Sequence, residues 1–324
     1  MRRYVGWAGL LVVAGLLPFV VTGGPARLLA ITALIYSLLA ASWNLTLGFG
    51  GIFNFAHVGF FGAGGYTMAV ATVSWGWAPW PGLLLAAVVG GVAGGLAYLP
   101  VVRMRGIYIA LVTFIFVQLC YYLVLALPGL TGGSVGLTGV PSLSIGGFSL
   151  ARYYGLGYLW LLGVAVALLL ILLGVVLRSD FGRSIIALRD NENLAVSRGI
   201  SRVRQHLLVF VLSGAIAGAA GALYVSYFRV ADNSLFSFGF VTLGLSMVFL
   251  GGTGYAWGPV LGGVVVTFLN EKLTGLGAYS AVVIGLGTVL VLVFLPRGLA
   301  GLLHDGFTAA ARSLTKKGKR AHAT

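Results

Sequence analysis

The feature that most constrains this chain is the stretch 28–102, which contains no Lys, Arg, Asp or Glu. A membrane-spanning helix needs about 20 apolar residues, so this stretch alone is long enough for about three spans. The whole chain is 59% hydrophobic and only 8% charged, whereas soluble domains carry about 25% charged residues. The sequence therefore predicts an integral membrane protein.

Successive apolar runs predict an all-α, polytopic helical bundle of about ten spans, with eight or nine as the alternatives. The first run has the charged start and apolar core of a signal peptide, but no small-residue cleavage site stands out, so we expect it to remain as a span. Residues 1–303 would form the membrane domain, and residues 304–324 a basic cytoplasmic tail. The expected spans are 4–21, 28–47, 54–73, 82–101, 106–127, 153–177, 207–228, 238–251, 258–275 and 278–296.

Charge predicts the orientation of these spans. The formal net charge is +14, and the basic residues lie at the ends of apolar runs, which fits the positive-inside rule and anionic lipid and disfavours nucleic acid. With ten crossings, both termini, Arg103, Arg105 and the segment 178–206 are cytoplasmic. The loop 128–152 then lies outside, as either a docking surface for an external partner or an ordinary exposed loop. The outer side also receives Arg27, Arg152, Arg229, Asp232 and Lys272.

Charge is densest in residues 178–206, which hold six arginines and three of the chain's six acids. A charged side chain at the bilayer centre costs about 2.5–3.5 kcal/mol, so this segment must lie outside the hydrocarbon. It reads as a turn at SDFG, an amphipathic stretch, then Arg198-Gly199 and a second basic stretch. This order predicts a loop that contacts a cytoplasmic protein. The alternative is a solvated linker whose arginines only fix the topology.

Two glycine-rich segments, 47–67 and 250–263, interrupt the apolar pattern. Glycine allows unusual backbone angles, and irregular backbone at membrane depth persists only where protein or a water-lined cavity satisfies it. We therefore predict broken or re-entrant helices that line a substrate pathway. The alternative for 47–67 is a packed glycine-face helix whose polar side chains are satisfied internally. The candidate pathway residues are Asn54, His57, Gly59, Gly251, Gly252 and Gly254.

The chain lacks the motifs that catalysis or energy conversion would require. It has no GxxxxGK[ST] phosphate loop and no metal-ligand cluster, because its four histidines are far apart and Cys120 is its single cysteine. Proton- or sodium-coupled carriers generally use acids within their spans, whereas here only Glu271 lies at the end of one. We therefore predict a transport protein that is not an enzyme, binds no metal or cofactor directly, and is driven by another subunit.

Seven stretches resemble the permease subunits of ATP-binding cassette importers for branched-chain amino acids, of the LivM type. They occur in the same order as in that family. Together they extend over most of the chain, from about residue 40 to residue 302. They are SWNLTLGFGGIFNFAHVGFFGAGGYT (42–67), RGIYIALVTFIFVQ (105–118), TGGSVGLTG (131–139), SDFGRSIIALRDNENLAVSRGI (179–200), LSGAIAGAAGALY (212–224), FLGGTGYAWGPVLGG (249–263) and LPRGLAGLL (295–303).

This resemblance implies a subunit in the bacterial inner membrane that moves branched-chain or related hydrophobic amino acids. It implies as partners a second homologous permease, two cytoplasmic ATPase subunits that use ATP and Mg²⁺, and an extracytoplasmic binding protein. The alternative is a self-contained channel or secondary carrier for small polar solutes, since related permeases handle urea or short amides.

The resemblance also assigns roles within 178–206, which corresponds to the loop that docks into the ATPase. Glu192, Ala195 and Gly199 stand at the E-x-x-A-x-x-x-G positions of that loop. Asp180 would cap the helix that begins there. The remaining candidate coupling residues are Phe181, Gly182, Arg183 and Arg189.

Overall fold

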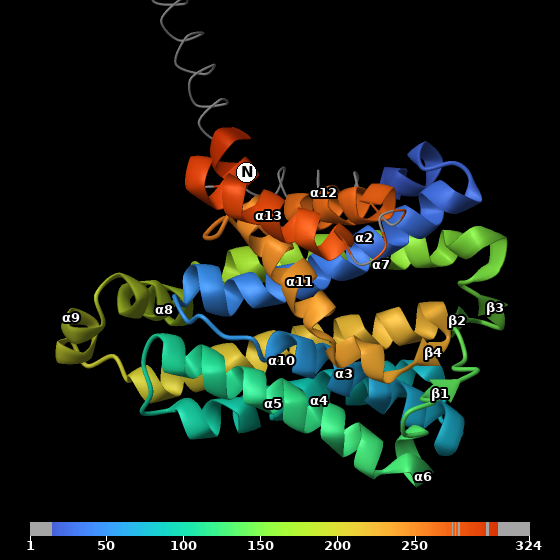
Figure 1. Ribbon diagram of the computed structural model, residues 1–324, viewed down its shortest axis with the longest axis horizontal. Coiled ribbons are helices and arrows are strands. Elements are labelled where there is room, and N and C mark those ends of the chain that lie inside the picture. Colours follow the sequence, from blue (N-terminus) through green and yellow to red (C-terminus); the bar gives the residue numbers. More distant parts are fainter. Residues whose placement is uncertain (1–14, 274, 276, 278, 296–297, 304–324) are drawn as a thin grey trace, which may run out of the picture.

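The computed structural model describes residues 15–273, 275, 277, 279–295 and 298–303 (Figure 1). Most of the expected span 4–21 and the tail 304–324 lie outside the described residues. The helices are α2 (Gly24–Asn44), α3 (His57–Ala69), α4 (Pro79–Tyr98), α5 (Ile107–Ala126), α6 (Pro128–Thr131), α7 (Arg152–Val176), α8 (Asp180–Asp190), α9 (Glu192–Ser197), α10 (Arg202–Phe228), α11 (Phe238–Gly251), α12 (Gly258–Leu273) and α13 (Tyr279–Phe294).

Shorter elements extend or connect these helices. Two π-helical turns, Leu45–Phe49 and Val70–Ser74, continue α2 and α3, and two 3-10 turns cover Leu99–Val101 and Asn233–Phe236. The strands are β1 (Leu137–Thr138), β2 (Ser144–Ile145), β3 (Phe148–Ser149) and β4 (Val230–Ala231). β1 pairs antiparallel with β4, and β2 with β3, so the loop 128–152 is tied to the connection that follows α10.

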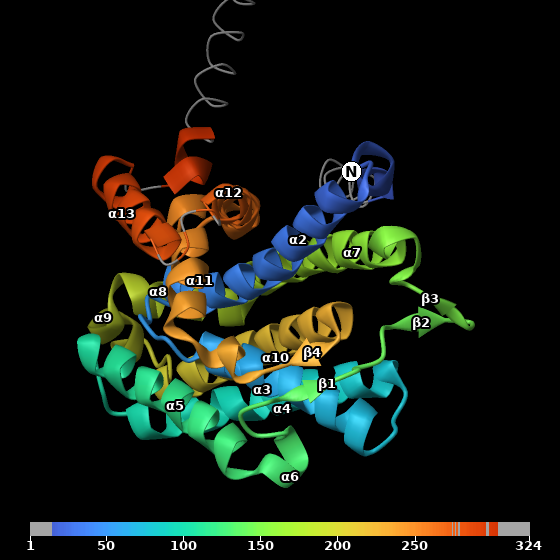
Figure 2. The same ribbon diagram turned by 45° about the vertical axis from the view of Figure 1, so that its right-hand side comes forward.

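The long helices form two layers that lie against each other (Figures 1 and 2). α3, α4, α5 and α10 make up one layer, and α2, α7, α12 and α13 the other, with α11 running obliquely between them. α10 packs along α3 and α4, and α2 packs along α7 and α12. The short helices α8 and α9 lie at one end of the bundle and the strands at the other. The architecture is the predicted polytopic helical bundle.

Glycine brings the helices of one layer into backbone contact. A Cβ added at Gly218 of α10 would lie 2.5 Å from the carbonyl oxygen of Ala86 and 2.9 Å from the Cα of Gly90. One added at Gly221 would collide with the carbonyl of Phe61 on α3. Lipid tails supply no hydrophobic force between helices, so close van der Waals packing through small residues takes its place. Part of the high glycine content therefore holds α10 against α3 and α4.

Both glycine-rich segments are broken, as the sequence predicts. The helical stretch that begins with α2 ends at Phe49, and irregular backbone leads to α3 at His57. In the second segment α11 ends at Gly251 and α12 begins at Gly258. The turn between them places Gly252 and Gly254 at φ 108° and 86°, values that favour glycine.

The charged residues separate into the two groups predicted from the sequence. At one end Arg105 pairs with Glu192 at 2.8 Å. At the other end an Nη of Arg27 donates to the carbonyl of Tyr153 (2.9 Å), and Nε of Arg229 donates to that of Val140 (3.3 Å). The arginines of 178–206 lie at the α8–α9 end, which therefore carries the greater positive charge. That this end is cytoplasmic stays a prediction from the positive-inside rule.

The expected count of about ten spans is not confirmed. In the described part of the chain, the stretches long and apolar enough to cross a membrane number six. The expected spans 54–73, 238–251 and 258–275 correspond to α3, α11 and α12, which have 13, 14 and 16 residues. The breaks shorten these helices below the ~20 residues that a straight span needs. The six stretches are Gly24–Phe49, Pro79–Val101, Ile107–Ala126, Arg152–Val176, Arg202–Phe228 and Val282–Leu303, the last with two residues that are not described.

The glycine contacts make a prediction about stability. Gly218→Val should force α10 away from α4 and lower the free energy of unfolding by about 1–3 kcal/mol or more, the usual cost of overpacking. Gly174→Val on α7 is the matched control, because a Cβ there meets nothing within 4 Å. Thermal unfolding in detergent would measure both. Equal melting temperatures for the two variants would contradict the packing role of Gly218.

Candidate functional site

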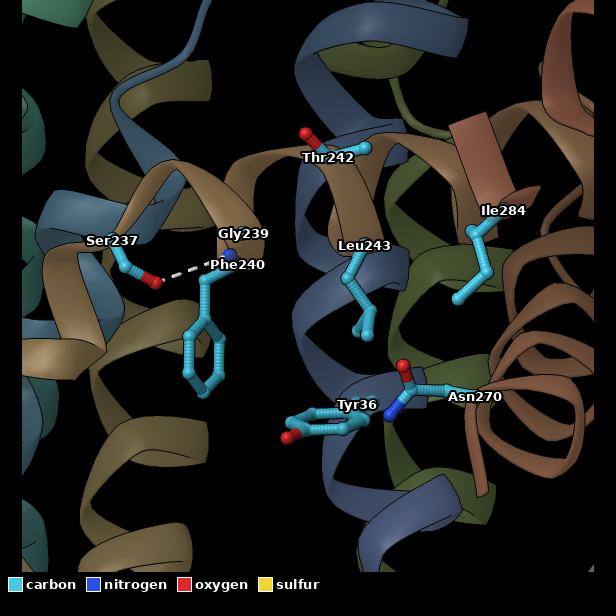
Figure 3. A pocket seen from close by; sticks show the side chains of 8 residues that line it. All are labelled: Tyr36, Ser237, Gly239, Phe240, Thr242, Leu243, Asn270 and Ile284. Atoms are coloured by element: carbon cyan, nitrogen blue, oxygen red, sulfur yellow. Dashed lines mark hydrogen bonds between the residues drawn. The ribbon is translucent and has the colours of Figure 1, made fainter. Parts of the chain in front are cut away.

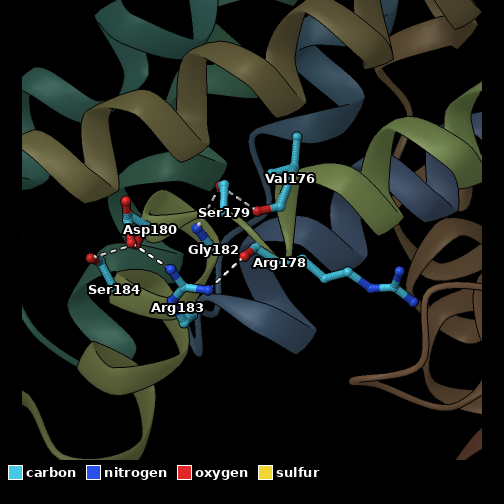
Figure 4. A network of polar contacts seen from close by, with 7 residues as sticks. All are labelled: Val176, Arg178, Ser179, Asp180, Gly182, Arg183 and Ser184. Carbon is cyan, nitrogen blue, oxygen red and sulfur yellow. Dashed lines mark hydrogen bonds and ion pairs between the residues drawn. The ribbon is translucent and has the colours of Figure 1, made fainter.

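Helix α8 begins with a side-chain cap, and the prediction that Asp180 forms it is wrong. Ser179, not Asp180, is the cap: its hydroxyl accepts from the N–H of Gly182 at 3.3 Å and donates to the carbonyl of Val176 at 2.6 Å (Figure 4). Asp180 is the first helical residue, where a negative charge is favourable next to the helix N-terminus. It forms an ion pair with Arg183, whose Nη1 also donates to the carbonyl of Arg178 at 2.8 Å.

One face of α8 is buried against the bundle. Gly182, Ile185 and Leu188 are buried, and Phe181 is half-buried against the core. Gly182 sits so close to the end of α7 that a Cβ would lie 2.5 Å from the Cα of Leu177. The opposite face is in solvent, with the side chain of Arg183 67% exposed and that of Asp180 97% exposed. α8 therefore has a fixed inner face and a free outer one.

Helix α9 is anchored through Glu192. Its carboxylate pairs with Arg105 at 2.8 Å, just before α5, and lies 3.6 Å from Nε of Arg202, at the start of α10. Arg202 also donates to the carbonyl of Met104. One acid thus connects α9 to the segment before α5 and to the start of α10, two elements of the same layer. Glu192 is part of the support of the loop as well as a candidate contact residue.

The other two E-x-x-A-x-x-x-G positions shape the end of α9. Ala195 is buried, and its carbonyl accepts from the N–H of Ile200 at 3.1 Å, while Gly199 donates to the carbonyl of Val196 at 2.9 Å. These two bonds form a Schellman cap, which requires a left-handed residue after the helix. Gly199 supplies it with φ 85°. The spacing of alanine and glycine therefore has a structural cause.

Arg189 connects α8 to the first glycine-rich break. Its Nη1 donates to the carbonyl of Gly48 at 2.9 Å, in the π-helical turn after α2. Its Nε and Nη2 lie 2.9 and 2.8 Å from Oδ1 of Asp190, which orients the guanidinium. The aliphatic part packs on Gly51, where a Cβ would lie 2.6 Å from Cγ of Arg189. Arg189 thus points toward the membrane bundle, and not along the free face of α8.

Asn44 continues this connection to the second break. Its Nδ2 donates to the carbonyl of Tyr255 at 3.0 Å, and its Oδ1 accepts from the N–H of Gly254 at 3.3 Å. Gly48 packs directly on the same turn, since a Cβ there would lie 2.7 Å from the nitrogen of Gly254. We call Arg189, Gly48, Asn44 and Gly254 the junction. It joins α8 to both breaks.

Asn54 and His57 form a closed network beside the junction. Asn54 Nδ2 donates to the hydroxyl of Thr46 (3.0 Å) and the carbonyl of Ile52 (3.2 Å), and its Oδ1 lies 3.0 Å from Nδ1 of His57. The imidazole stacks on Trp43, whose indole N–H donates to the Asn54 carbonyl at 2.9 Å. Nε2 of His57 is buried without a well-formed hydrogen bond among the described residues.

The other candidate pathway residues are glycines packed closely against neighbouring segments. A Cβ at Gly59 would lie 3.3 Å from the ring of Phe116, and one at Gly251 would lie 2.6 Å from the carbonyl carbon of Gly258. Gly252 packs against Gly298. Asn54 and His57 are fully buried. The segment 47–67 is therefore both broken and internally satisfied, and a pathway role for its residues stays a prediction.

Sequence reasoning missed several residues of this region. Asn44 and Thr46 were visible as polar residues in an apolar run, which is the signal that could have singled them out. Arg105 and Arg202 were recognised only as topology markers, because nothing in the sequence pairs them with Glu192. In the described residues no three His, Cys, Asp or Glu side chains gather into a metal site.

Comparison with known proteins finds similarity to transport permeases over most of the chain. Residues 27–293 match the family described as the permease component of the branched-chain amino acid transport system. The chain belongs to this permease family. The LivM permease protein of the high-affinity branched-chain amino acid transport system of Salmonella typhimurium is 31% identical over 90% of this chain and 73% of its own length.

More distant relatives extend the comparison. The probable LivH permease protein of Methanocaldococcus jannaschii is 27% identical over 83% of this permease and 91% of its own length. The D-allose permease protein AlsC of Escherichia coli is 34% identical over 40% of this permease and 41% of its own length. No solved structure matches the chain. The similarity to transport-system permeases bears out the predicted family, and a self-contained channel or carrier is not supported.

The buried network makes a prediction that separates a structural from a pathway role. Asn54→Ala would remove the partner of His57 Nδ1 and the donor to the Thr46 hydroxyl oxygen, so it should lower the free energy of unfolding by about 1–3 kcal/mol. Thermal unfolding of the purified permease checks this. Asn193→Ala, at an exposed position of α9, is the control and should change stability little. A stable Asn54→Ala protein with altered solute preference would instead support the pathway role.

Proposed function

We propose that this permease is the membrane-spanning subunit of an ATP-driven importer that moves branched-chain or related hydrophobic amino acids across the bacterial inner membrane. Its partners are a second homologous permease, two cytoplasmic ATPase subunits and an extracytoplasmic binding protein. The names of its relatives support the substrate class and the transport system. The observation that supports the mechanism is the junction, which connects the surface helix α8 to both breaks of the membrane bundle.

The free surfaces of α8 and α9 suit a protein partner. Leu194 and Val196 on α9 are 56% and 49% exposed, next to the charged outer face of α8. Apolar side chains beside arginines are typical of docking surfaces, in which an apolar centre is surrounded by charge. Since the chain has no phosphate-binding loop, ATP must be bound by that partner. We infer that Asp180, Arg183 and α9 contact the ATPase.

The junction then transmits the movement. Closure of the two ATPase subunits pushes on the outer face of α8, whose inner face is packed against the end of α7. Arg189 carries the displacement to Gly48, and Asn44 carries it to Gly254 on the second break. Broken helices joined by glycine turns change angle at small cost, so the bundle can alternate between two arrangements as rigid pieces. In this role Arg189 is a positioning residue.

The proposed function is tested by reconstitution. The permease, co-expressed with the candidate ATPase, permease and binding proteins encoded in neighbouring reading frames, should purify as a complex and take up radiolabelled leucine into liposomes. Uptake should need ATP, because the chain has no acids placed for ion coupling. Leucine uptake by the permease alone, or uptake that continues without ATP, would contradict the proposal.

Arg189→Ala should uncouple this complex. A hydrogen bond from a charged group contributes about 1.5–3 kcal/mol, so its loss should raise the ATP hydrolysed per leucine transported roughly tenfold or more. The melting temperature should fall by a few degrees, because the Gly48 carbonyl loses its donor, while co-purification of the ATPase should change little. Arg152→Ala at the other end of the molecule removes the same charge and is the control. An unchanged ratio in Arg189→Ala would contradict the transmitting role, as would equal rises in both variants.

A further inference from the structure

A polar cavity lies beside Tyr36 of α2, eight residues before Asn44 of the junction. It has a volume of about 310 Å³ and is bounded by α2, α11, α12 and α13. Tyr36, Ser237, Thr242 and Asn270 face it with hydroxyl and amide groups, and Phe240 and Leu243 supply apolar surface (Figure 3). The Ser237 hydroxyl caps α11 by accepting from the N–H of Phe240 at 3.4 Å. This volume is within the range of small-molecule sites.

A second cavity of about 440 Å³ adjoins the first and shares Tyr36 and Asn270 with it. It lies between α2 and the last turn of α12, and its rim carries Glu271 and Lys272. The ammonium of Lys272 lies 5.7 Å from the centre of the Phe268 ring, so its charge is held at this rim. We call the two cavities together the outer notch. It combines one acid, one base, several neutral polar groups and apolar surface.

Two other cavities of the molecule differ in chemistry. One, of about 440 Å³, is lined mainly by apolar residues between α3, α4 and α5, and the other, of about 690 Å³, by apolar residues of α2, α12 and the segment before α2. Such surfaces are compatible with lipid. Polar groups at membrane depth are costly unless they face protein or water. The polar lining of the outer notch therefore indicates a route for solute.

The walls of the outer notch continue to the junction. α2 lines the notch from Pro25 to Tyr36 and carries Asn44 at its C-terminal end, where Asn44 bonds Gly254. α11 and α12, which supply Thr242 and Asn270, meet at the break between Gly251 and Gly258. A displacement at the junction thus moves the helices that bound the notch. The notch, which extends along α2 from Tyr36 to Pro25, is thus connected to α8 through α2 and the junction.

We propose that the outer notch is the site through which a small zwitterionic solute enters the permease. Glu271 receives its ammonium group, Lys272 its carboxylate, and Phe240 and Leu243 contact its aliphatic part. Tyr36, Thr242 and Asn270 replace the water that the solute loses as it moves inward. This site is distinct from Asn54, His57 and the glycines predicted from the sequence, and it rests on the proposed importer function.

The test uses the reconstituted complex with Cys120, the single native cysteine, replaced by alanine. Thr242→Cys should react with a small, charged methanethiosulfonate reagent added outside, and the modification should abolish leucine uptake. Thr67→Cys is the matched control: both threonines donate to the carbonyl four residues earlier, but Thr67 lines an apolar cavity. Thr242→Cys should react roughly tenfold faster or more, and millimolar leucine should slow it.

A second pair of variants keeps the test independent of that cysteine. Lys272→Met and Glu271→Gln are at exposed positions, and each should raise the leucine concentration for half-maximal uptake roughly tenfold. Reaction of Thr242→Cys no faster than that of Thr67→Cys, or unchanged uptake in modified Thr242→Cys, would overturn the proposal while the importer itself still works. Unchanged half-saturation in both charge variants would also overturn it. Absence of uptake by the unmodified complex would instead reject the importer function.

Discussion

The structure depends on one constraint: backbone groups freed by a helix break at membrane depth must find partners within the protein. The breaks of this chain are satisfied by side chains. The Trp43 indole serves the carbonyl of Asn54, the Thr113 hydroxyl accepts from the N–H of Phe55 at 3.0 Å, and Asn44 bonds the turn at Gly254. Arg189 does the same for the carbonyl of Gly48 from outside the bundle. The backbone at each break is therefore fixed in a defined conformation by hydrogen bonds.

This constraint explains why the surface helix α8 is mechanically coupled to the membrane bundle. A helix that only covered the end of the bundle could shift without consequence for the spans. α8 cannot shift in this way, because Arg189 donates a hydrogen bond to the carbonyl of Gly48 and Gly182 packs against α7. Moving α8 must either carry Gly48 along or leave that carbonyl unpaired, which costs free energy. The same bond thus stabilises the fold and, in the proposed mechanism, transmits the movement of α8.

Composition and charge were enough to predict a polytopic helical bundle, because an uncharged stretch as long as 28–102 leaves few other folds available. Glycine density predicted both breaks. The partners of the breaks could not be predicted, since Asn44 and Tyr255 or Arg189 and Gly48 are far apart in sequence and meet only after folding. The span count is not confirmed for a related reason: hydropathy shows that a run is apolar but not where a break shortens it. Asp180 was taken as the cap because Ser179 and Asp180 are both good capping residues.

The length of α2 determines how far a movement at the junction displaces the helix at the outer notch. α2 has 21 residues, so at about 1.5 Å per residue it is about 30 Å long and reaches from the junction to the outer notch. A rotation of about 10° around one end of such a rod moves the other end by about 5 Å, comparable to the larger shifts seen in switching proteins. In the proposed mechanism, a small displacement of α8 therefore changes the width of the notch. Rigid helices and glycine joints would then allow one hydrogen bond at the surface to control a distant site within the bundle.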